Sequence, residues 1–326
     1  MSELVNNAKM KFFPMKAPQA STLPSETIRV GNTPLLDLSF LLPKGCSAWR
    51  LSAKAEWHNP GGSVKDRAAL RIVQEAERAG KLGPGKTLLD ATSGNTGIAY
   101  AWIGARLGYK ISLAVPGTLN AQRRSILEAY GVELLFTSPL EGSDGAIREA
   151  RMLYAAEPGR YFYADQYNND ANWRAHYDNT GPEIAAQTDG TVTHFVTGLG
   201  TSGTFTGIGR YFRKHAPAVK LYSVEPDAPL HGLEGLKHMA SALVPGIYDP
   251  KLADERLEIA TDAGQAMAKR LARAHGLLVG PSGGANLAAC VALAERLAGE
   301  GGSGHLVTIL PDSGERYLSD RFWSEP

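Results

Sequence analysis

One lysine in this sequence stands where a positive charge is unfavourable. Lys65 follows a strand-like run and the turn Pro60-Gly61-Gly62, and Ser63 can cap the helix that the pattern predicts next. In the first turn of a helix, the positive end of the helix dipole destabilises an ammonium group by up to about 1 kcal/mol. The position therefore favours an uncharged nitrogen, either an amine of lowered pKa or the imine of a Schiff base. A solvated surface lysine is the commoner alternative for such a residue taken alone.

Three further loops between expected strands and helices are rich in glycine and hydroxyl groups. They are Thr92-Ser93-Gly94-Asn95-Thr96-Gly97, Gly198-Leu199-Gly200-Thr201-Ser202-Gly203-Thr204 and Gly280-Pro281-Ser282-Gly283-Gly284-Ala285-Asn286. The first brings hydroxyls, an amide and backbone N–H groups to a helix start, which suits a substrate carboxylate or is an ordinary cap. In the second, glycines let the backbone approach a phosphate, and the hydroxyls can donate to it. In the third, Ser282 could simply cap a helix.

The second loop also matches a dinucleotide-binding pattern. Gly198, Gly200 and Gly203 have the spacing GxGxxG between a strand and a helix, and Glu225 ends the next strand, about where a ribose-binding acid would stand. An NAD-dependent oxidoreductase is therefore an alternative from a different class.

The sequence predicts alternating strands and helices that position these loops. Strands are expected at 49–55, 87–90, 111–115, 132–136, 193–196, 220–224 and 306–310, and helices at 64–78, 98–107, 121–130, 146–155 and 265–274. Near-continuous apolar strands alternating with amphipathic helices indicate mostly parallel sheets covered on both faces, so the fold class is α/β. In such sheets a ligand lies beyond the carboxyl ends of the strands, where the strand order reverses.

The composition excludes several classes of protein. Of 326 residues, 43% are hydrophobic and 21% charged, as in an ordinary globular enzyme. A formal net charge of +1 gives no field for nucleic acid or a membrane surface, and no stretch is apolar enough to span a bilayer. Cys46 and Cys290 have no spacing typical of a disulfide framework or metal site, so we expect no metal and a reducing compartment, the cytoplasm. Residues 1–25 lack the apolar core of a secretory signal and are interpreted as a loosely ordered extension.

Taken together, the motifs resemble the β-family (fold type II) of pyridoxal-phosphate enzymes, and within it the cysteine synthases, or O-acetylserine sulfhydrylases. The resemblance covers nearly the whole chain. Besides the loops above, it rests on Gly31-Asn32-Thr33-Pro34-Leu35, Gln166-Tyr167-Asn168-Asn169, Thr180-Gly181-Pro182-Glu183 and Asp312-Ser313-Gly314-Glu315-Arg316-Tyr317-Leu318-Ser319. The GxGxxG match then becomes the family's phosphate loop, and the dinucleotide alternative becomes a distant one.

The resemblance implies a set of site residues. Lys65 would hold pyridoxal 5'-phosphate as a Schiff base and act as the catalytic base, Asn95 would bond the cofactor's phenolic oxygen, and Ser282 would face its ring nitrogen. The cofactor phosphate would be held by Gly200, Thr201, Ser202, Gly203 and Thr204, and the substrate carboxylate by Thr92, Ser93, Asn95, Thr96 and Gln166. Ser202 departs from a frequent glycine of the family, and the usual second Ser or Thr after Ser282 is a glycine here.

The resemblance also implies an architecture like that of the tryptophan synthase β-subunit. Residues 1–57 and 165–326 would form a larger domain that binds the cofactor phosphate. Residues 58–164 would form a smaller, mobile domain carrying Lys65 and the carboxylate loop, with the cofactor in the cleft between the two. The family is usually dimeric, so we expect a homodimer.

The implied activity is replacement of the β-substituent of an O-activated L-serine, either O-acetylserine or O-phosphoserine, by sulfide to give L-cysteine. A hydroxyl rather than an Asp opposite the ring nitrogen favours loss of the β-substituent over transamination. Lys237 could meet an anionic leaving group, or it is a solvated charge of a lid. Cystathionine β-synthase, with a thiol as nucleophile, serine or threonine dehydratase, and a catalytically silent scaffold protein are the alternatives.

Overall fold

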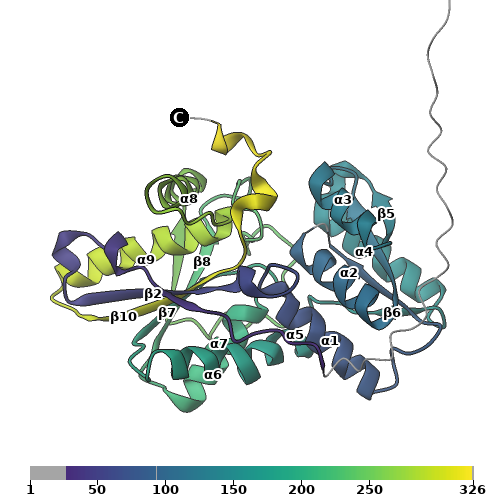
Figure 1. Ribbon diagram of the computed structural model, residues 1–326, viewed down its shortest axis with the longest axis horizontal. Helices are drawn as coiled ribbons and strands as arrows, with labels where there is room; N and C mark the ends of the chain where they lie inside the picture. Colours follow the sequence, from purple (N-terminus) through teal and green to yellow (C-terminus); the bar gives the residue numbers. More distant parts are fainter. Residues whose placement is uncertain (1–26, 93, 325–326) are drawn as a thin grey trace, which may run out of the picture.

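Two separate β-sheets organise the chain, for which the computed structural model describes residues 27–92 and 94–324 (Figure 1). The larger sheet has the strand order β1-β2-β10-β7-β8-β9. Its strands are β1 (Leu35–Asp37), β2 (Trp49–Ala55), β7 (His194–Gly198), β8 (Lys220–Pro226), β9 (Glu255–Ile259) and β10 (Gly304–Leu310). All neighbouring strands are parallel except β1, which runs antiparallel to β2.

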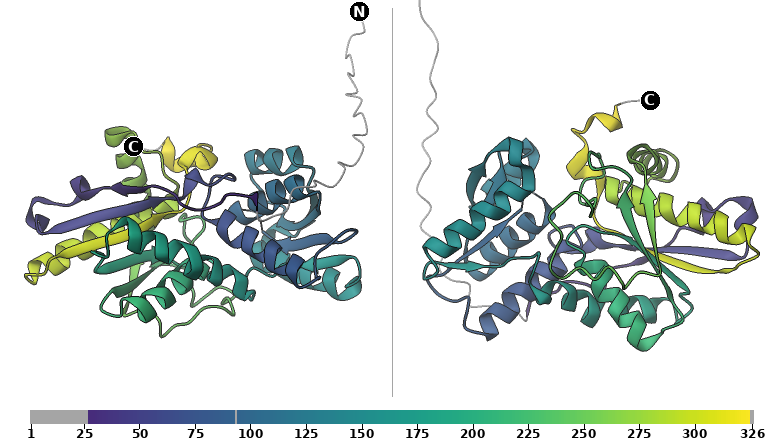
Figure 2. Two further views of the ribbon diagram at one scale, coloured as in Figure 1. Left: turned by 60° about the horizontal axis from the view of Figure 1, so that its bottom comes forward. Right: turned by 180° about the vertical axis from the view of Figure 1, so that it is seen from behind.

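The smaller sheet is parallel throughout and has the order β5-β4-β3-β6. Its strands are β3 (Thr87–Ala91), β4 (Lys110–Pro116), β5 (Glu133–Thr137) and β6 (Tyr161–Tyr163). Figure 2 shows this sheet and its helices beside the larger sheet. The prediction of an α/β fold with mostly parallel sheets is confirmed.

Helices cover both faces of each sheet. They are α1 (Lys65–Arg78), α2 (Asn95–Leu107), α3 (Ala121–Ala129), α4 (Gly142–Ala156), α5 (Asp170–Ala175), α6 (Gly181–Gln187), α7 (Gly203–His215), α8 (Thr261–His275) and α9 (Pro281–Gly299). None of the helices in the described ranges combines the length and the apolar character that crossing a bilayer requires.

In the central strands, alternate side chains pack against helices on opposite faces of the sheet. In β10, Leu306 and Leu310 pack with α8 and α9, whereas Val307 and Ile309 pack with α7 on the opposite face. Successive side chains of a strand point to opposite faces, so a strand that is apolar at every position must be covered twice. Leu88 and Leu89 divide the smaller sheet in the same way, the first facing α1 and α2 and the second facing α4.

Candidate active site

A cavity of about 290 Å³ lies where the carboxyl ends of the two sheets meet. In each sheet the strand order reverses at this point, because β4 and β6 flank β3, and β8 and β10 flank β7. Thr92 follows β3, Gln166 follows β6, Gly200 follows β7 and Pro311 follows β10, and all four residues line the cavity. The arrangement is the one expected for ligand sites of parallel sheets.

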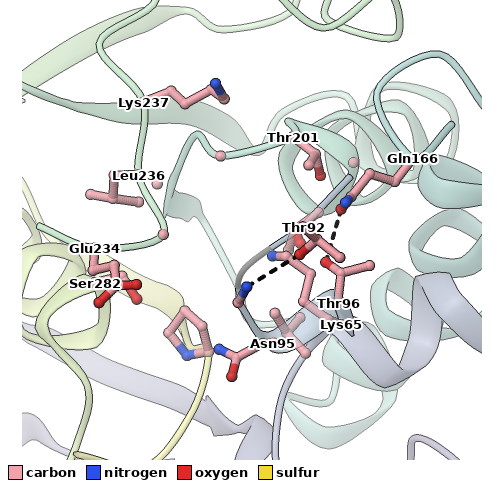
Figure 3. A pocket seen from close by; sticks show the side chains of 18 of the residues that line it. Lys65, Thr92, Asn95, Thr96, Gln166, Thr201, Glu234, Leu236, Lys237 and Ser282 are labelled. Atoms are coloured by element: carbon pink, nitrogen blue, oxygen red, sulfur yellow. Dashed lines mark hydrogen bonds between the residues drawn. The ribbon is translucent and has the colours of Figure 1, made fainter. Parts of the chain in front are cut away.

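Lys65 is the first residue of α1 and points into this cavity (Figure 3). The helix begins after Val64, and the hydroxyl of Ser63 accepts a hydrogen bond from the Lys65 backbone N–H at 3.3 Å. Burial lowers the pKa of the Lys65 amine, although the Asp312 and Glu56 carboxylates act in the opposite direction. Lys65 is therefore not a solvated surface lysine, and the amine is shifted towards its uncharged, nucleophilic form.

The five residues 200–204 form the turn that leads from β7 into α7, and all of them line the cavity. A Cβ atom on Gly200 would collide with the backbone oxygen of Gly235, and one on Gly203 would collide with the side chain of Asn172. The backbone thus approaches its neighbours more closely than any side chain would allow. The turn also directs the N-terminus of α7, with its backbone N–H groups, at the cavity, which is a site suited to phosphate.

Ser202 is the unusual member of this turn. Its φ of +65° lies in the left-handed region that is unfavourable for residues other than glycine. The residue lines the cavity, and its hydroxyl is buried and has no hydrogen-bond partner among the described residues. A buried hydroxyl without a partner is costly unless a ligand satisfies it.

Neighbouring polar side chains hold the other hydroxyls of the turn. Asn172 donates a hydrogen bond to Thr201 Oγ1 at 3.1 Å, and His176 Nε2 lies 3.3 Å from Thr204 Oγ1. The second ring nitrogen of His176 lies 2.9 Å from Thr180 Oγ1. Sequence reasoning missed Asn172 and His176, because they lie on another helical segment and carry no local motif.

The loop after β3 brings the predicted carboxylate-binding residues to the other side of the cavity. Thr96 donates a hydrogen bond to Gln166 Oε1 at 2.8 Å (Figure 3), and Gln166 Nε2 in turn donates to the backbone of Ala91 at 3.3 Å. Thr92 also lines the cavity. Ser93, predicted for the same role, lies outside the described residues.

Ser282 lies in the first turn of α9 and lines the cavity, with only 4% of its surface exposed. The helix begins at Pro281 after Gly280, so Ser282 is not its N-cap. The interpretation of Ser282 as a simple cap is therefore wrong. Asn286, one turn further along, lines the same cavity and its Oδ1 atom has no partner among the described residues.

Asn95 is held by residues of the C-terminal segment. Its Nδ2 atom donates to Asp312 Oδ2 at 2.6 Å, and its Oδ1 atom accepts a hydrogen bond from Arg316. Asp312 also accepts from the Tyr317 hydroxyl at 2.5 Å. An amide nitrogen carries two hydrogens, so Asn95 retains one for a ligand. The sequence position of Asp312 could have indicated it as a site residue, since it follows an apolar strand at the carboxyl edge of the sheet.

Three charged residues also line the cavity, namely Arg123, Glu234 and Lys237. Arg123 of α3 pairs with Glu234, and Lys237 lies 4.0 Å from Asp144 of α4. Lys237 also lies 5.1 Å above the ring centre of Tyr167. Burial lowers the pKa of Lys237, and Asp144 partly offsets this effect.

The described residues do not form the ribose-binding site of a dinucleotide fold or a metal site. Glu225 lines a separate depression with His238 and Tyr248, and its Oε2 atom accepts a hydrogen bond from the backbone of Met239 at 3.0 Å. It is therefore not placed to bind a ribose beside the glycine-rich turn. Within residues 27–92 and 94–324, no group of three or more His, Cys, Asp or Glu side chains is arranged to hold a metal ion.

Comparisons with known proteins agree with this geometry. The family described as "Pyridoxal-phosphate dependent enzyme" matches residues 27–312. A cysteine synthase of Aquifex aeolicus is 46% identical over 297 residues, which are 91% of either chain. The crystal structure of cysteine synthase from Entamoeba histolytica has a TM-score of 0.85 at 34% identity, covering 100% of this chain and 95% of that one. An O-ureido-L-serine synthase has a TM-score of 0.83 at 35% identity, covering 90% and 93%.

The cavity offers what this cofactor requires. The unpartnered Ser202 hydroxyl and the close-packed glycine turn suit a phosphate, and the Lys65 amine suits an aldehyde. The chain belongs to the family of pyridoxal-phosphate-dependent enzymes, and its relatives within that family include cysteine synthases.

Proposed function

We propose that this protein is a cysteine synthase, which replaces the β-substituent of O-acetyl-L-serine by sulfide. The observation that supports this most directly is the position of Lys65. Its amine shares one cavity with the 200–204 turn and with the loop from Thr92 to Thr96. A group for the cofactor's aldehyde, a site for its phosphate and a site for an amino-acid carboxylate are thus combined.

The residues divide the work between cofactor and substrate. Residues 200–204 would hold the phosphate, Asn95 the phenolic oxygen and Ser282 the ring nitrogen. When bound, the cofactor supplies a conjugated ring that withdraws electrons from the substrate's α-carbon. Thr92, Ser93, Asn95, Thr96 and Gln166 would bind the substrate carboxylate.

Lys65 would accept the proton from the substrate's α-carbon and later return it. An unperturbed lysine has a pKa of about 10.4, so at neutral pH very little of it could act as a base. The lowered pKa of Lys65 increases that fraction. Ser282 is a neutral hydroxyl and would not hold a proton on the ring nitrogen as an Asp would. This favours rapid loss of the β-substituent over transamination.

We further propose that residues 58–164 form a smaller domain that closes over the substrate, against a larger domain of residues 1–57 and 165–326. Residues 1–26, 93, 325 and 326 of these ranges lie outside the described residues. Carboxylate binding at the Thr92–Thr96 loop would draw the smaller sheet towards the larger one. The pairs Arg123–Glu234 and Lys237–Asp144 join α3 and α4 to the loop at 234–237 and are the contacts that such closure would use. The proposal includes a cytoplasmic homodimer, as is usual for the family.

Product analysis tests the activity. The purified protein, supplied with O-acetylserine and sulfide, should release cysteine and acetate in equal amounts. Borohydride reduction before substrate is added should attach the cofactor to the peptide that contains Lys65. Release of pyruvate and ammonia without cysteine would instead indicate a dehydratase, and a requirement for homocysteine would indicate a cystathionine β-synthase.

O-Phosphoserine is a second candidate substrate, and the position of Lys237 favours it. The side chain is 13% exposed, borders the cavity, and its nearest carboxylate is at the limit of an ion pair. It could therefore turn to an anionic leaving group. Turnover of O-acetylserine and O-phosphoserine should be compared for the wild type and Lys237→Ala. A selective loss with O-phosphoserine supports the role, and an unchanged ratio of the two rates refutes it.

A further inference from the structure

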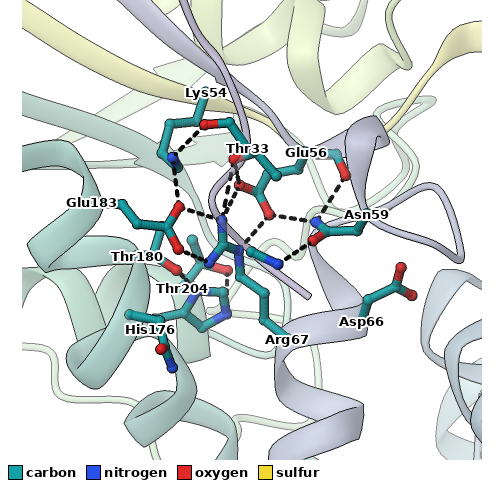
Figure 4. A network of polar contacts seen from close by, with 12 residues as sticks. Thr33, Lys54, Glu56, Asn59, Asp66, Arg67, His176, Thr180, Glu183 and Thr204 are labelled. Carbon is teal, nitrogen blue, oxygen red and sulfur yellow. Dashed lines mark hydrogen bonds and ion pairs between the residues drawn. The ribbon is translucent and has the colours of Figure 1, made fainter. Parts of the chain in front are cut away.

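Three buried charged side chains and a fourth that is 16% exposed form a cluster behind the helix that begins with Lys65 (Figure 4). They are Lys54 at the end of β2, Glu56 in the following turn, Arg67 in the first turn of α1, and Glu183 on α6. Lys54 and Glu56 have no exposed surface, and Arg67 is 4% exposed. Two cations and two carboxylates give the cluster no net charge, which is the condition under which buried charges are tolerated.

Arg67 is the centre of this cluster. Its guanidinium donates to both oxygens of Glu56, at 2.6 and 2.8 Å, and to both oxygens of Glu183, at 2.7 and 2.8 Å. Lys54 donates to Glu183 at 2.7 Å and to the side chain of Gln187 at 2.9 Å. Burial opposes the ionisation of Glu183, but the bonds from Arg67 and Lys54 outweigh it and lower the Glu183 pKa to about 2.

The cluster holds α1 from the side opposite the cavity. Arg67 follows Lys65 by two residues, and two steps along a helix rotate a side chain by about 200°. Lys65 therefore faces the cavity while Arg67 faces the cluster. Asn59 extends the contact to the preceding turn, since it donates to Glu56 at 2.9 Å and to the backbone of Ser63 at 3.1 Å.

One member of the cluster, Glu56, acts on the charge of the Lys65 amine. The groups that act on Lys65 from other elements are Asp312 after β10, Glu56 after β2 and His176 near α6. Burial, with Arg67 and Lys65 nearby, lowers the pKa of His176 well below its usual range, so this ring is uncharged near pH 7. Glu56 is compensated by Arg67, and Asp312 is bound by Asn95 and Tyr317.

We propose that Arg67 is a positioning residue that keeps the amine of Lys65 uncharged and directed into the cavity, by neutralising Glu56 and Glu183 behind it. The inference rests on the proposed role of Lys65. Without Arg67 the cluster would carry a net negative charge, which stabilises an ammonium group. The pKa of Lys65 would therefore rise, and a rise of one unit corresponds to about 1.4 kcal/mol of interaction with the added charge.

The test follows the rate at which full-length protein, freed of its cofactor, forms an imine with added pyridoxal phosphate. The rate is recorded by visible absorbance from pH 6 to 10, and borohydride with peptide mass analysis identifies Lys65 as the site. For Arg67→Gln we expect the pH at which the rate is half-maximal to rise by about one unit. Below that pH, imine formation should then be roughly tenfold slower than in the wild type. Glu183→Gln should move it down by a similar amount, and the double variant should lie close to the wild type.

Arg71→Gln is the matched control. Arg71 lies one turn further along α1 and pairs with Glu75 and Asp178 at the surface, so its removal takes one charge from the same helix without disturbing the cluster. Its half-maximal pH should equal that of the wild type. An Arg67→Gln profile equal to that of Arg71→Gln, or a double variant that keeps the full shift, overturns the proposal.

Folding and the proposed function can be separated from this outcome. If Arg67→Gln does not fold, as judged by circular dichroism, Glu183→Gln decides, because an unshifted profile refutes the role of charge. A wild-type protein that forms no imine at Lys65 would contradict the proposed function itself. A wild type that reacts at Lys65 while its variants show no shifts would contradict only the role of Arg67.

Discussion

Replacing Ser202 should change cofactor affinity and the stability of the cofactor-free protein in opposite directions. The Ser202 hydroxyl is buried without a partner, and its backbone has a φ of +65°. Burying an unsatisfied hydroxyl costs about 1–3 kcal/mol, and a left-handed backbone costs a further 1–2 kcal/mol or so. Such costs persist where they serve a ligand. A hydrogen bond from this hydroxyl to a phosphate would contribute about 1.5–3 kcal/mol.

Two substitutions separate the backbone from the hydroxyl. Ser202→Ala keeps the strained backbone and removes the hydroxyl, so pyridoxal phosphate should bind roughly 10 to 150 times more weakly. Ser202→Gly should lose as much affinity, yet unfold at a higher denaturant concentration than Ser202→Ala in the absence of cofactor, because glycine accepts a positive φ.

The assay measures cofactor binding by quenching of tryptophan fluorescence, and unfolding by urea titration of the cofactor-free protein. Pyridoxal, which lacks the phosphate, should bind all variants equally well. Ser223→Ala is a suitable control, since Ser223 is also a buried hydroxyl without a partner in the described residues but does not line the cavity. If Ser202→Ala binds pyridoxal phosphate as tightly as the wild type, the hydroxyl does not serve the phosphate and the reasoning fails.

Three further outcomes are expected. Lys65→Ala should lose 10²-fold or more of the activity and all borohydride labelling, while its circular dichroism spectrum stays unchanged. Gly200→Ala should weaken cofactor binding by about 1–3 kcal/mol, because the new methyl group meets the backbone of Gly235, whereas Gly45→Ala, which meets nothing within 4 Å, should bind normally. Glu183 has its pKa lowered from 4.5 to about 2, so its contribution to stability is present above pH 4.5 and is lost as the pH falls towards 2. Urea unfolding should show this loss, of at most about 3 kcal/mol, and Glu183→Gln should abolish most of it; an equally steep fall in the variant would contradict this assignment.

Long apolar strands and glycine-rich loops were readable from the sequence because their signals are local. The range expected for β2 agrees with the structure, and those for β3, β4 and β8 differ by one or two residues at an end. The strands that were missed, β1, β6 and β9, have other causes. Two of them have only three residues, too few to show a period, and β9 is a sheet edge whose sequence Glu-Arg-Leu-Glu-Ile is mostly polar.

The candidate site divides in the same way. Residues that would touch the ligand follow strand ends, where small and hydroxyl side chains interrupt an apolar pattern, so position alone indicates them. Residues that hydrogen-bond to these ligand-contacting residues do not interrupt an apolar pattern, so the sequence gives no sign of them. Asn172 and His176 lie in an ordinary polar helical stretch, and only the folded chain brings them to Thr201 and Thr204.

Arg67 shows why this second group escapes sequence reasoning and why it matters to the chemistry. In the sequence it is an unremarkable arginine in a helix, and its partner Glu183 stands 116 positions away. Arg67 matters because it is buried. A guanidinium that binds two carboxylates away from water holds their side chains in place and neutralises their charge. On the proposals made above, the chemistry of Lys65 would depend on Arg67, which lies outside the loop that carries Lys65. Substitutions in the cluster should alter Lys65 while every group that lines the cavity stays in place.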